Sequence, residues 1–219
     1  MAIVDSLGTD PLIKTVTDFV RDYMSNYDAS HDFGHIQRVV GQAHYIYTKE
    51  VTTNPALDLQ TVVLAGLLHD VGDRKYLKPG EDASTMVRQI LLDKGASEEL
   101  AQKVQTICLG VSYSSEIKDL AKVQDLIKAH PELAVVQDAD RLDAIGAIGV
   151  GRCFTYGGAK TGRSMDDSIE HFEEKLLLIE DMMKTDTGRK LAKERSDRLR
   201  LFREWWRDES SFLETPVLN

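Results

Sequence analysis

The stretch VVLAGLLHD, residues 62–70, decides the fold and also indicates a site. Residues 62–68 are apolar without interruption, which is typical of a helix buried on all sides, so we predict a central helix over residues 57–71. Such a helix has little reason to end in an imidazole beside a carboxylate, His69 and Asp70, unless something compensates both. Both side chains are ligands of divalent cations. Two ligands leave two interpretations open, a metal ion or a hydrogen-bonded pair at the end of a central helix, and the rest of the chain must decide between them.

Most of the remaining chain has the apolar period of amphipathic helices. We expect helices over residues 11–25, 30–50, 82–94, 97–110, 116–129, 131–145, 166–183 and 186–209. Ser30 is the expected N-cap of the second of these, and residues 156–163, rich in glycine, are the expected functional loop. We predict one all-α domain over residues 1–219, with nine or ten helices and a core over about 10–210 between short tails.

Composition excludes several classes of function. The 27 basic and 36 acidic residues give a net charge of −9 without a basic block, so duplex nucleic acid is a poor partner. A small anion stays compatible, because a metal and local cations can reverse the potential in a pocket. The N-terminus has no signal-peptide pattern and no stretch reaches the ~20 apolar residues of a membrane span, so we expect a soluble cytoplasmic protein.

Further metal-binding residue types lie elsewhere in the chain. His31 and His35 are four residues apart on one predicted helix, with Arg38 one turn further on. Asp73 follows Asp70 by three residues and is a spare carboxylate near the predicted metal. The apolar segment 135–143 contains several buried-looking acids, which again requires a cation. Two of these acids, Asp138 and Asp143, either orient the site or cap and pair structurally.

The order His35, His69-Asp70, Asp140 is an H…HD…D pattern. With the short motifs that flank these residues, the chain resembles the HD-domain superfamily of metal-dependent phosphohydrolases. These motifs are HDFGHIQRV at 31–39, LLHDVGDRK at 67–75, VQDADRLDAIGAIGVGR at 136–152, FTYGG at 154–158 and HFEEKLL at 171–177. They are similar to those of a subfamily of small single-domain hydrolases, over about residues 10–210. Relative to shorter members, the helix near 116–130 is extra.

The resemblance implies an HD-type helical bundle in which His35, His69, Asp70 and Asp140 hold one divalent metal. The ligand set suits Mn, Co, Ni, Fe or Zn as well as Mg, and the family favours manganese. The implied activity is nucleoside triphosphate pyrophosphohydrolysis by metal-activated water. Alternatives within the fold are a nucleotide monophosphatase or a phosphodiesterase.

The resemblance also assigns roles to other residues. Asp73 matches a family acid that activates water, so we expect Asp73 and Asp70 to be catalytic. Cations and polar groups able to hold a nucleotide are expected at His31, Arg38, Arg74, Lys75, Arg141, Tyr156, His171 and Lys175, with Arg152 and Arg163 as further cations. Each of these has a structural alternative, as a cap, a surface pair or a packing residue.

Two functions of other classes stay open. An HD-fold di-iron oxygenase would need extra histidines between Asp70 and Asp140, where His130 is the only one. A non-catalytic nucleotide-binding module would use the same pocket without turnover. The expected partner is a small nucleotide, with no membrane and with a homodimer left open.

Overall fold

Helix α4 (Leu59–Leu68) lies at the centre of the fold. A computed structural model describes residues 10–73, 77 and 80–211. Asp58 begins α4 by accepting a hydrogen bond from the Thr61 N–H at 2.7 Å, and residues 61–68 are all buried. The helix ends at Leu68, earlier than expected, so His69 and Asp70 lie in the turn that follows. Gly72, at φ 82°, then takes a left-handed conformation that reverses the chain.

The described residues form eleven α-helices, which confirms the all-α class. Besides α4 they are α2 (Pro11–Tyr23), α3 (Phe33–Glu50), α5 (Met86–Asp93), α6 (Glu98–Val111), α7 (Tyr113–Lys118), α8 (Leu120–Ala129), α9 (Glu132–Asp143), α10 (Gly146–Tyr156), α11 (Met165–His171) and α12 (Asp186–Ser210). Short 3-10 or π segments are η1 (Met24–Asn26), η2 (Gly157–Thr161), η3 (Phe172–Leu176) and η4 (Leu177–Met182).

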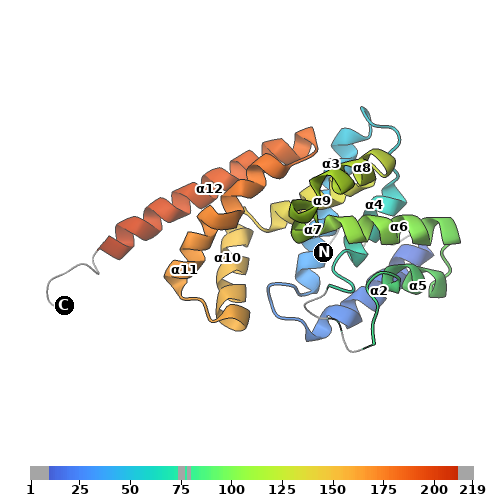
Figure 1. The fold of residues 1–219 in the computed structure, drawn as a ribbon, viewed down its shortest axis with the longest axis horizontal. Coiled ribbons are helices and arrows are strands. Elements are labelled where there is room, and N and C mark those ends of the chain that lie inside the picture. Colours follow the sequence, from blue (N-terminus) through green and yellow to red (C-terminus); the bar gives the residue numbers. More distant parts are fainter. Residues whose placement is uncertain (1–9, 74–76, 78–79, 212–219) are drawn as a thin grey trace.

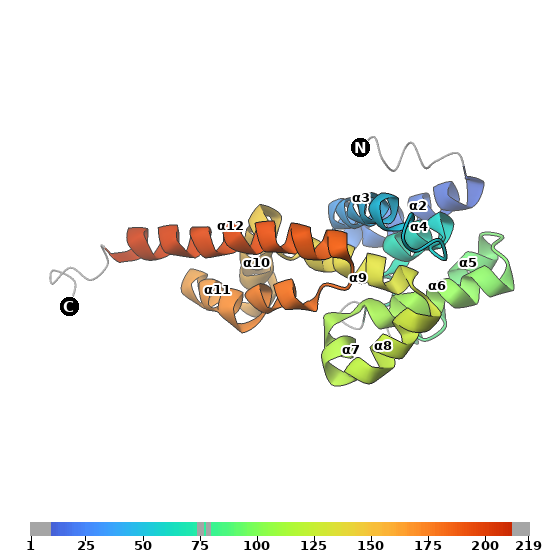
Figure 2. The same cartoon turned by 90° about the horizontal axis from the view of Figure 1, so that it is seen from above.

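Two apolar clusters hold these helices together. The first joins α2, α3, α4, α5, α6 and α9, and the second joins α3, α4 and α9 to η3, η4 and α12. Helix α12 extends past the others, with α10 and α11 beside its C-terminal half (Figures 1 and 2). Helices α3, α4 and α9 belong to both clusters, and the predicted metal ligands lie on α3 and α9 or directly after α4.

Helix boundaries differ from the expectation at several places. Asp32, not Ser30, caps α3, because its carboxylate accepts from the His35 N–H at 3.1 Å. The expected helix 116–129 is two helices, because Asp119 leaves the helical conformation (φ −151°) and caps α8 through the Lys122 N–H. Both capping residues are aspartates. Aspartate and serine are both common N-caps, so the sequence alone did not decide which residue begins each helix.

The C-terminal third also differs in detail. Residues 157–161, expected as part of a loop, continue α10 as the π segment η2, which ends at Gly162 with φ 63°. Residues 166–183 are α-helical only through His171 and then pass through η3 and η4. The spacing of apolar residues does not distinguish α-, π- and 3-10 helices, because each type buries one stripe of side chains.

No helix of the described segments combines the length and the apolar character that crossing a lipid bilayer requires.

Candidate metal centre

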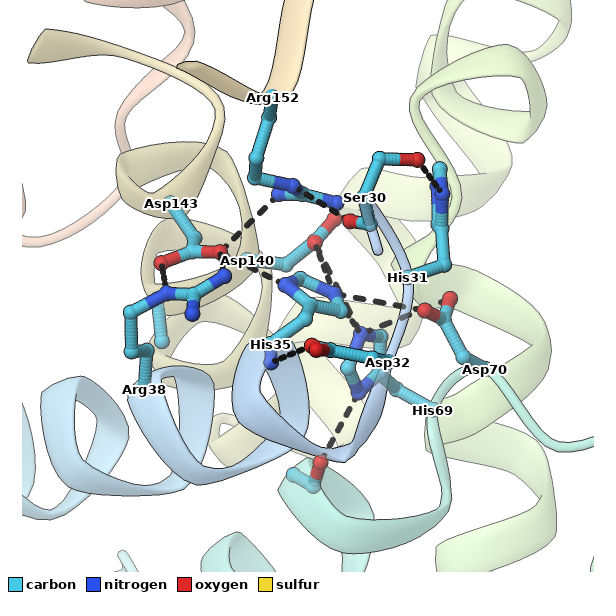
Figure 3. Close-up of polar contacts among 12 residues, drawn as sticks. Ser30, His31, Asp32, His35, Arg38, His69, Asp70, Asp140, Asp143 and Arg152 are labelled. Atoms are coloured by element: carbon cyan, nitrogen blue, oxygen red, sulfur yellow. Dashed lines mark hydrogen bonds and ion pairs between the residues drawn. The ribbon is translucent and has the colours of Figure 1, made fainter. Parts of the chain in front are cut away.

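Three helices bring two histidines and two aspartates to one place (Figure 3). His35 lies on the first turn of α3, His69 and Asp70 follow α4 directly, and Asp140 lies on the last turn of α9. The two Nε2 atoms are 3.2 Å apart. Asp140 Oδ1 lies 3.6 Å from Nε2 of His35 and 3.7 Å from Nε2 of His69. The structure thus brings together all four predicted ligands.

The second nitrogen of each imidazole has a partner that orients the ring. His69 Nδ1 donates to the Gly66 carbonyl oxygen at 2.9 Å, since a carbonyl can only accept. His35 Nδ1 donates to Asp143 Oδ2 at 2.7 Å. In the neutral rings both Nε2 atoms therefore carry a lone pair and face each other. Two lone pairs at this distance require a proton or a metal ion between them.

The donor set fits a divalent cation. His35, His69 and Asp140 each offer one ligand atom, all within 4.8 Å of one another. Asp70 Oδ2 lies 3.3 Å from His35 Nε2, and this buried oxygen accepts no well-aligned hydrogen bond from the part of the chain that the structure describes. A buried carboxylate oxygen without such a bond is costly. A metal ion would satisfy it together with both imidazoles.

Asp143 lies behind the proposed metal ligands and contacts several cationic side chains. It is 1% exposed and accepts from Arg38 Nε at 2.7 Å and Nη2 at 3.0 Å, and from Arg152 Nη1 at 3.1 Å, in addition to His35. Arg152 also donates from Nε to the Ser30 carbonyl oxygen at 2.8 Å. Burial alone would raise the pKa of Asp143, but these cationic donors hold it well below its usual range. An ionised Asp143 therefore fixes the His35 ring.

Metal binding should depend on pH through His35. Burial lowers the pKa of His35, but its contacts with Asp143 and Asp70 outweigh burial and raise the pKa from 6.5 to about 9 in the metal-free protein. The protonated ring stabilises the metal-free fold fully below pH 6.5, and this stabilisation is lost as pH rises through about 9. Because a metal must displace this proton, we expect its Kd to fall about tenfold per pH unit over this window.

Isothermal titration with Mn²⁺ in buffers of different ionisation enthalpy would count the protons released. One proton per bound ion at pH 7 is the expected result. A Kd that does not change between pH 6.5 and 8.5 would contradict it.

Several predicted substrate residues lie beside the centre. The His31 ring is 6.0 Å from the His35 ring and 5.7 Å from the Tyr156 ring, measured between centroids. His31 Nδ1 lies 2.7 Å from Ser30 Oγ. Arg38 faces Asp143, as described above, with its side chain 35% exposed. The structure thus brings His31, Arg38 and Tyr156 to the edge of the metal centre.

Asp73 lies in the turn after α4, and its N–H donates to the Asp70 carbonyl oxygen at 3.1 Å. This contact holds the backbone of Asp73 close to that of a proposed metal ligand. Its role as a catalytic base stays a prediction. Arg74 and Lys75, the next two predicted substrate residues, lie outside the described residues.

Arg141 is not brought to the centre. It is 2% exposed, and its guanidinium pairs with Glu116 and donates to the Val111 and Gln137 carbonyl oxygens. Glu116 and Val111 belong to α7 and α6, which carry none of the proposed metal ligands, so we do not retain Arg141 as a phosphate ligand. One residue along a helix turns a side chain by ~100°, which explains the different environments of neighbours 140 and 141.

His171 and Lys175 contact residues outside the proposed ligand set. His171 Nδ1 lies 3.2 Å from Glu174, and Lys175 Nζ lies 4.7 Å from the centroid of the Tyr113 ring. Burial, followed by the nearby Arg163 and Lys175 charges, lowers the pKa of His171 against the opposing effect of Glu174. Contact of either residue with substrate stays a prediction.

Of the two acids on α9 with an open role, sequence reasoning favoured a structural role for Asp138 and left that of Asp143 open. Asp143 orients the site, whereas Asp138 accepts from the N–H groups of Lys184 and Thr185, just before α12. Arg152 was considered only as a phosphate ligand, and the role of Ser30 was missed. The useful signal was spacing, because residues 140 and 143 are three apart and share a helix face.

Comparison with known proteins identifies the family. The model of the HD domain matches residues 31–145, slightly more than half of the chain. The chain belongs to the HD domain family. All four proposed ligands lie within this match. The HD assignment agrees with the expected fold.

Relatives of known structure share this HD fold. YpgQ of Bacillus subtilis is 37% identical over 185 residues, which cover 83% of this chain and 85% of YpgQ. The crystal structure of YpgQ in complex with ADP matches 93% of this chain and 100% of that chain, with 35% identity and a TM-score of 0.69. An HD-superfamily hydrolase from Bacillus thuringiensis is 28% identical, covering 92% of this chain and 97% of its own, with a TM-score of 0.66.

Proposed function

We propose that this HD protein is a metal-dependent nucleotide phosphohydrolase that cleaves nucleoside triphosphates to the monophosphate and pyrophosphate. The observation that carries the proposal is the convergence of two imidazole Nε2 atoms with Asp70 and Asp140, including a buried carboxylate oxygen without a well-aligned hydrogen bond. The crystal structure of the relative YpgQ with ADP supports a nucleotide as ligand.

Four protein ligands leave positions of an octahedral ion for water and a phosphate oxygen, which suits Mn, Co, Ni, Fe or Mg, and manganese is our choice. When bound, such an ion lowers the pKa of water and neutralises charge on the phosphoryl group. The protein supplies orientation. Gly66 and Asp143 hold the two imidazole rings, so the ligand atoms are in place before the metal arrives.

Residues beside the metal centre would hold the nucleotide. Arg38 and Arg152 share one carboxylate, Asp143, so two guanidinium charges face a single negative one. A divalent ion would balance Asp70 and Asp140, and we infer that the two guanidinium groups then attract phosphates. His31 and Tyr156 form an aromatic edge at the same place. Arg74, Lys75, His171 and Lys175 are retained as proposed substrate contacts.

Product analysis tests the function. The purified protein, loaded with Mn²⁺, is incubated with each nucleoside triphosphate and its deoxy form, and products are identified by mass spectrometry. Monophosphate and pyrophosphate are expected. Release of orthophosphate from monophosphates would favour a nucleotidase, and tight nucleotide binding without turnover would favour a binding module.

Asp73→Asn tests the proposed proton acceptor. Without a base to accept the proton of the attacking water, kcat should fall by about 10²–10³-fold. Bound metal per chain should not change, because the four ligands remain. Steady-state kinetics and metal analysis of the same sample check both expectations. Loss of the metal together with activity would instead make Asp73 a ligand.

A further inference from the structure

Behind the metal centre, α9 contacts a buried ionic cluster that the proposed chemistry does not use. Its central residue is Glu116 of α7, which is 3% exposed. One carboxylate oxygen of Glu116 pairs with Arg141, and the other lies 2.6 Å from Lys184 Nζ. The Lys184 side chain is 15% exposed. Helices α7 and α9 and the segment before α12 therefore meet at one carboxylate.

Arg141 extends this cluster to the end of α6. Its Nη1 donates to the Val111 carbonyl oxygen at 3.3 Å and to the Gln137 carbonyl oxygen at 3.2 Å. Gln137 Nε2 donates to the Gly110 carbonyl oxygen at 2.8 Å. The last carbonyls of a helix have no partner inside that helix. Side chains of α9 therefore supply the hydrogen bonds with which α6 ends.

Stability alone does not account for buried charges here. Removing cations and a carboxylate from water is costly, and apolar residues of the same volume often stabilise a fold as well or better. Ion pairs differ from apolar contacts in having a defined direction. The Glu116–Arg141 pair, with the carbonyl contacts of Arg141, therefore specifies the rotation of α9 about its axis.

That rotation matters because Arg141 directly follows Asp140 and precedes Asp143 by two residues. All three lie on the last turn of α9. A small rotation of this turn would move the ligand oxygen of Asp140 and the carboxylate that holds His35 at the same time. The contacts of Arg141 lie on one side of the turn and the metal centre on another.

We propose that Glu116 is a positioning residue of the metal centre, which acts through Arg141 to set the orientation of Asp140 and Asp143. This inference rests on the proposed metal site. It gives a role to α7, whose residues contribute no proposed metal ligand.

The test compares two buried carboxylates, one that contacts α9 from α7 and one at the N-terminal end of α9 itself. Glu116→Gln removes the central charge of the cluster. The matched control is Glu132→Gln at the other end of α9, where Glu132 is 0% exposed and lies 2.7 Å from Lys103 Nζ. Mn²⁺ affinity is measured by calorimetry and thermal midpoints are recorded without metal. We expect both variants to lose thermal stability, but only Glu116→Gln to bind Mn²⁺ about tenfold more weakly.

A second variant separates positioning from folding. In Glu116→Gln/Arg141→Met, Gln can still accept from Lys184 and Met fills the space of Arg141 without its directed bonds. We expect a thermal midpoint near that of the wild type and a Kd for Mn²⁺ still about tenfold weaker. This variant also serves if Glu116→Gln alone does not fold.

Wild-type affinity in the double variant, or equal affinity losses in Glu116→Gln and Glu132→Gln, would overturn the positioning role. Failure of the wild type to bind Mn²⁺, Co²⁺, Ni²⁺ or Mg²⁺ is a different result. It would overturn the proposed metal site itself, and this inference with it.

Discussion

Asp70→Asn is expected to lower hydrolysis by about 10³-fold, with loss of the bound metal. The carboxylate lies 3.3 Å from His35 Nε2 and 3.5 Å from His69 Nε2, closer to these two nitrogens than Asp140, which is 3.6 and 3.7 Å away. An amide keeps the shape but not the charge, and metal-ion stabilisation of the reaction is worth several kcal/mol. About 4 kcal/mol corresponds to about 10³-fold in rate.

The fold should tolerate this substitution. Asparagine loses the attraction between Asp70 and the protonated His35 ring, but it also removes a buried charge whose Oδ2 accepts no well-aligned hydrogen bond from the described residues, and the two effects offset each other. We expect circular dichroism and the metal-free thermal midpoint to be close to those of the wild type. Asp125→Asn, at an exposed acid that pairs with Lys128, is the control and should keep metal and activity. Full activity of Asp70→Asn would contradict the proposed ligand set.

Asp143→Asn is expected to weaken metal binding by 10–100-fold although Asp143 is not a proposed ligand. It holds His35 Nδ1 at 2.7 Å, and loss of such an outer contact typically reduces metal affinity by about this factor. The same change leaves Arg38 and Arg152 without their shared negative charge. Removing one partner of a buried ion pair costs about 3–5 kcal/mol, because the other partner stays buried without its counter-charge. The free energy of unfolding should fall by a similar amount.

Urea unfolding of the metal-free protein and Mn²⁺ titration measure the two effects separately. The control is Lys103→Met, which breaks the buried pair of Lys103 with Glu132 on the same helix. It should lose stability but keep its Kd for Mn²⁺. An Asp143→Asn protein with a Kd within twofold of the wild type would show that Asp143 does not orient His35 toward the metal.

The sequence was sufficient for the parts of the site that depend on local rules. The apolar run before His69 indicated a buried helix, and the structure places that helix at the centre. The four-residue spacing of His31 and His35 predicted neighbouring rings, and their centroids are 6.0 Å apart. The expectation that both lie on one helix was wrong, since α3 begins at Phe33 and His31 precedes it.

Other parts of the site depended on contacts between distant segments. Asp138 and Asp143 have the same chemistry and lie on the same helix, yet one accepts from the backbone just before α12 and the other orients His35. Arg141 resembles a phosphate ligand in sequence but pairs with Glu116, 25 residues away. Which side chain faces which partner follows from how α7, α9 and α12 pack, and periodicity within one helix does not contain that information.

By itself, then, the sequence determined an all-α chain with a buried central helix and a set of histidines and aspartates suited to a divalent metal. These follow from apolar period and ligand chemistry, which are properties of short segments. Only the tertiary structure decided that α3, α4 and α9 meet so that two Nε2 atoms lie 3.2 Å apart, with Asp143 behind them. The physical reason is that helix rotation and crossing are set by side chains packed from many elements at once.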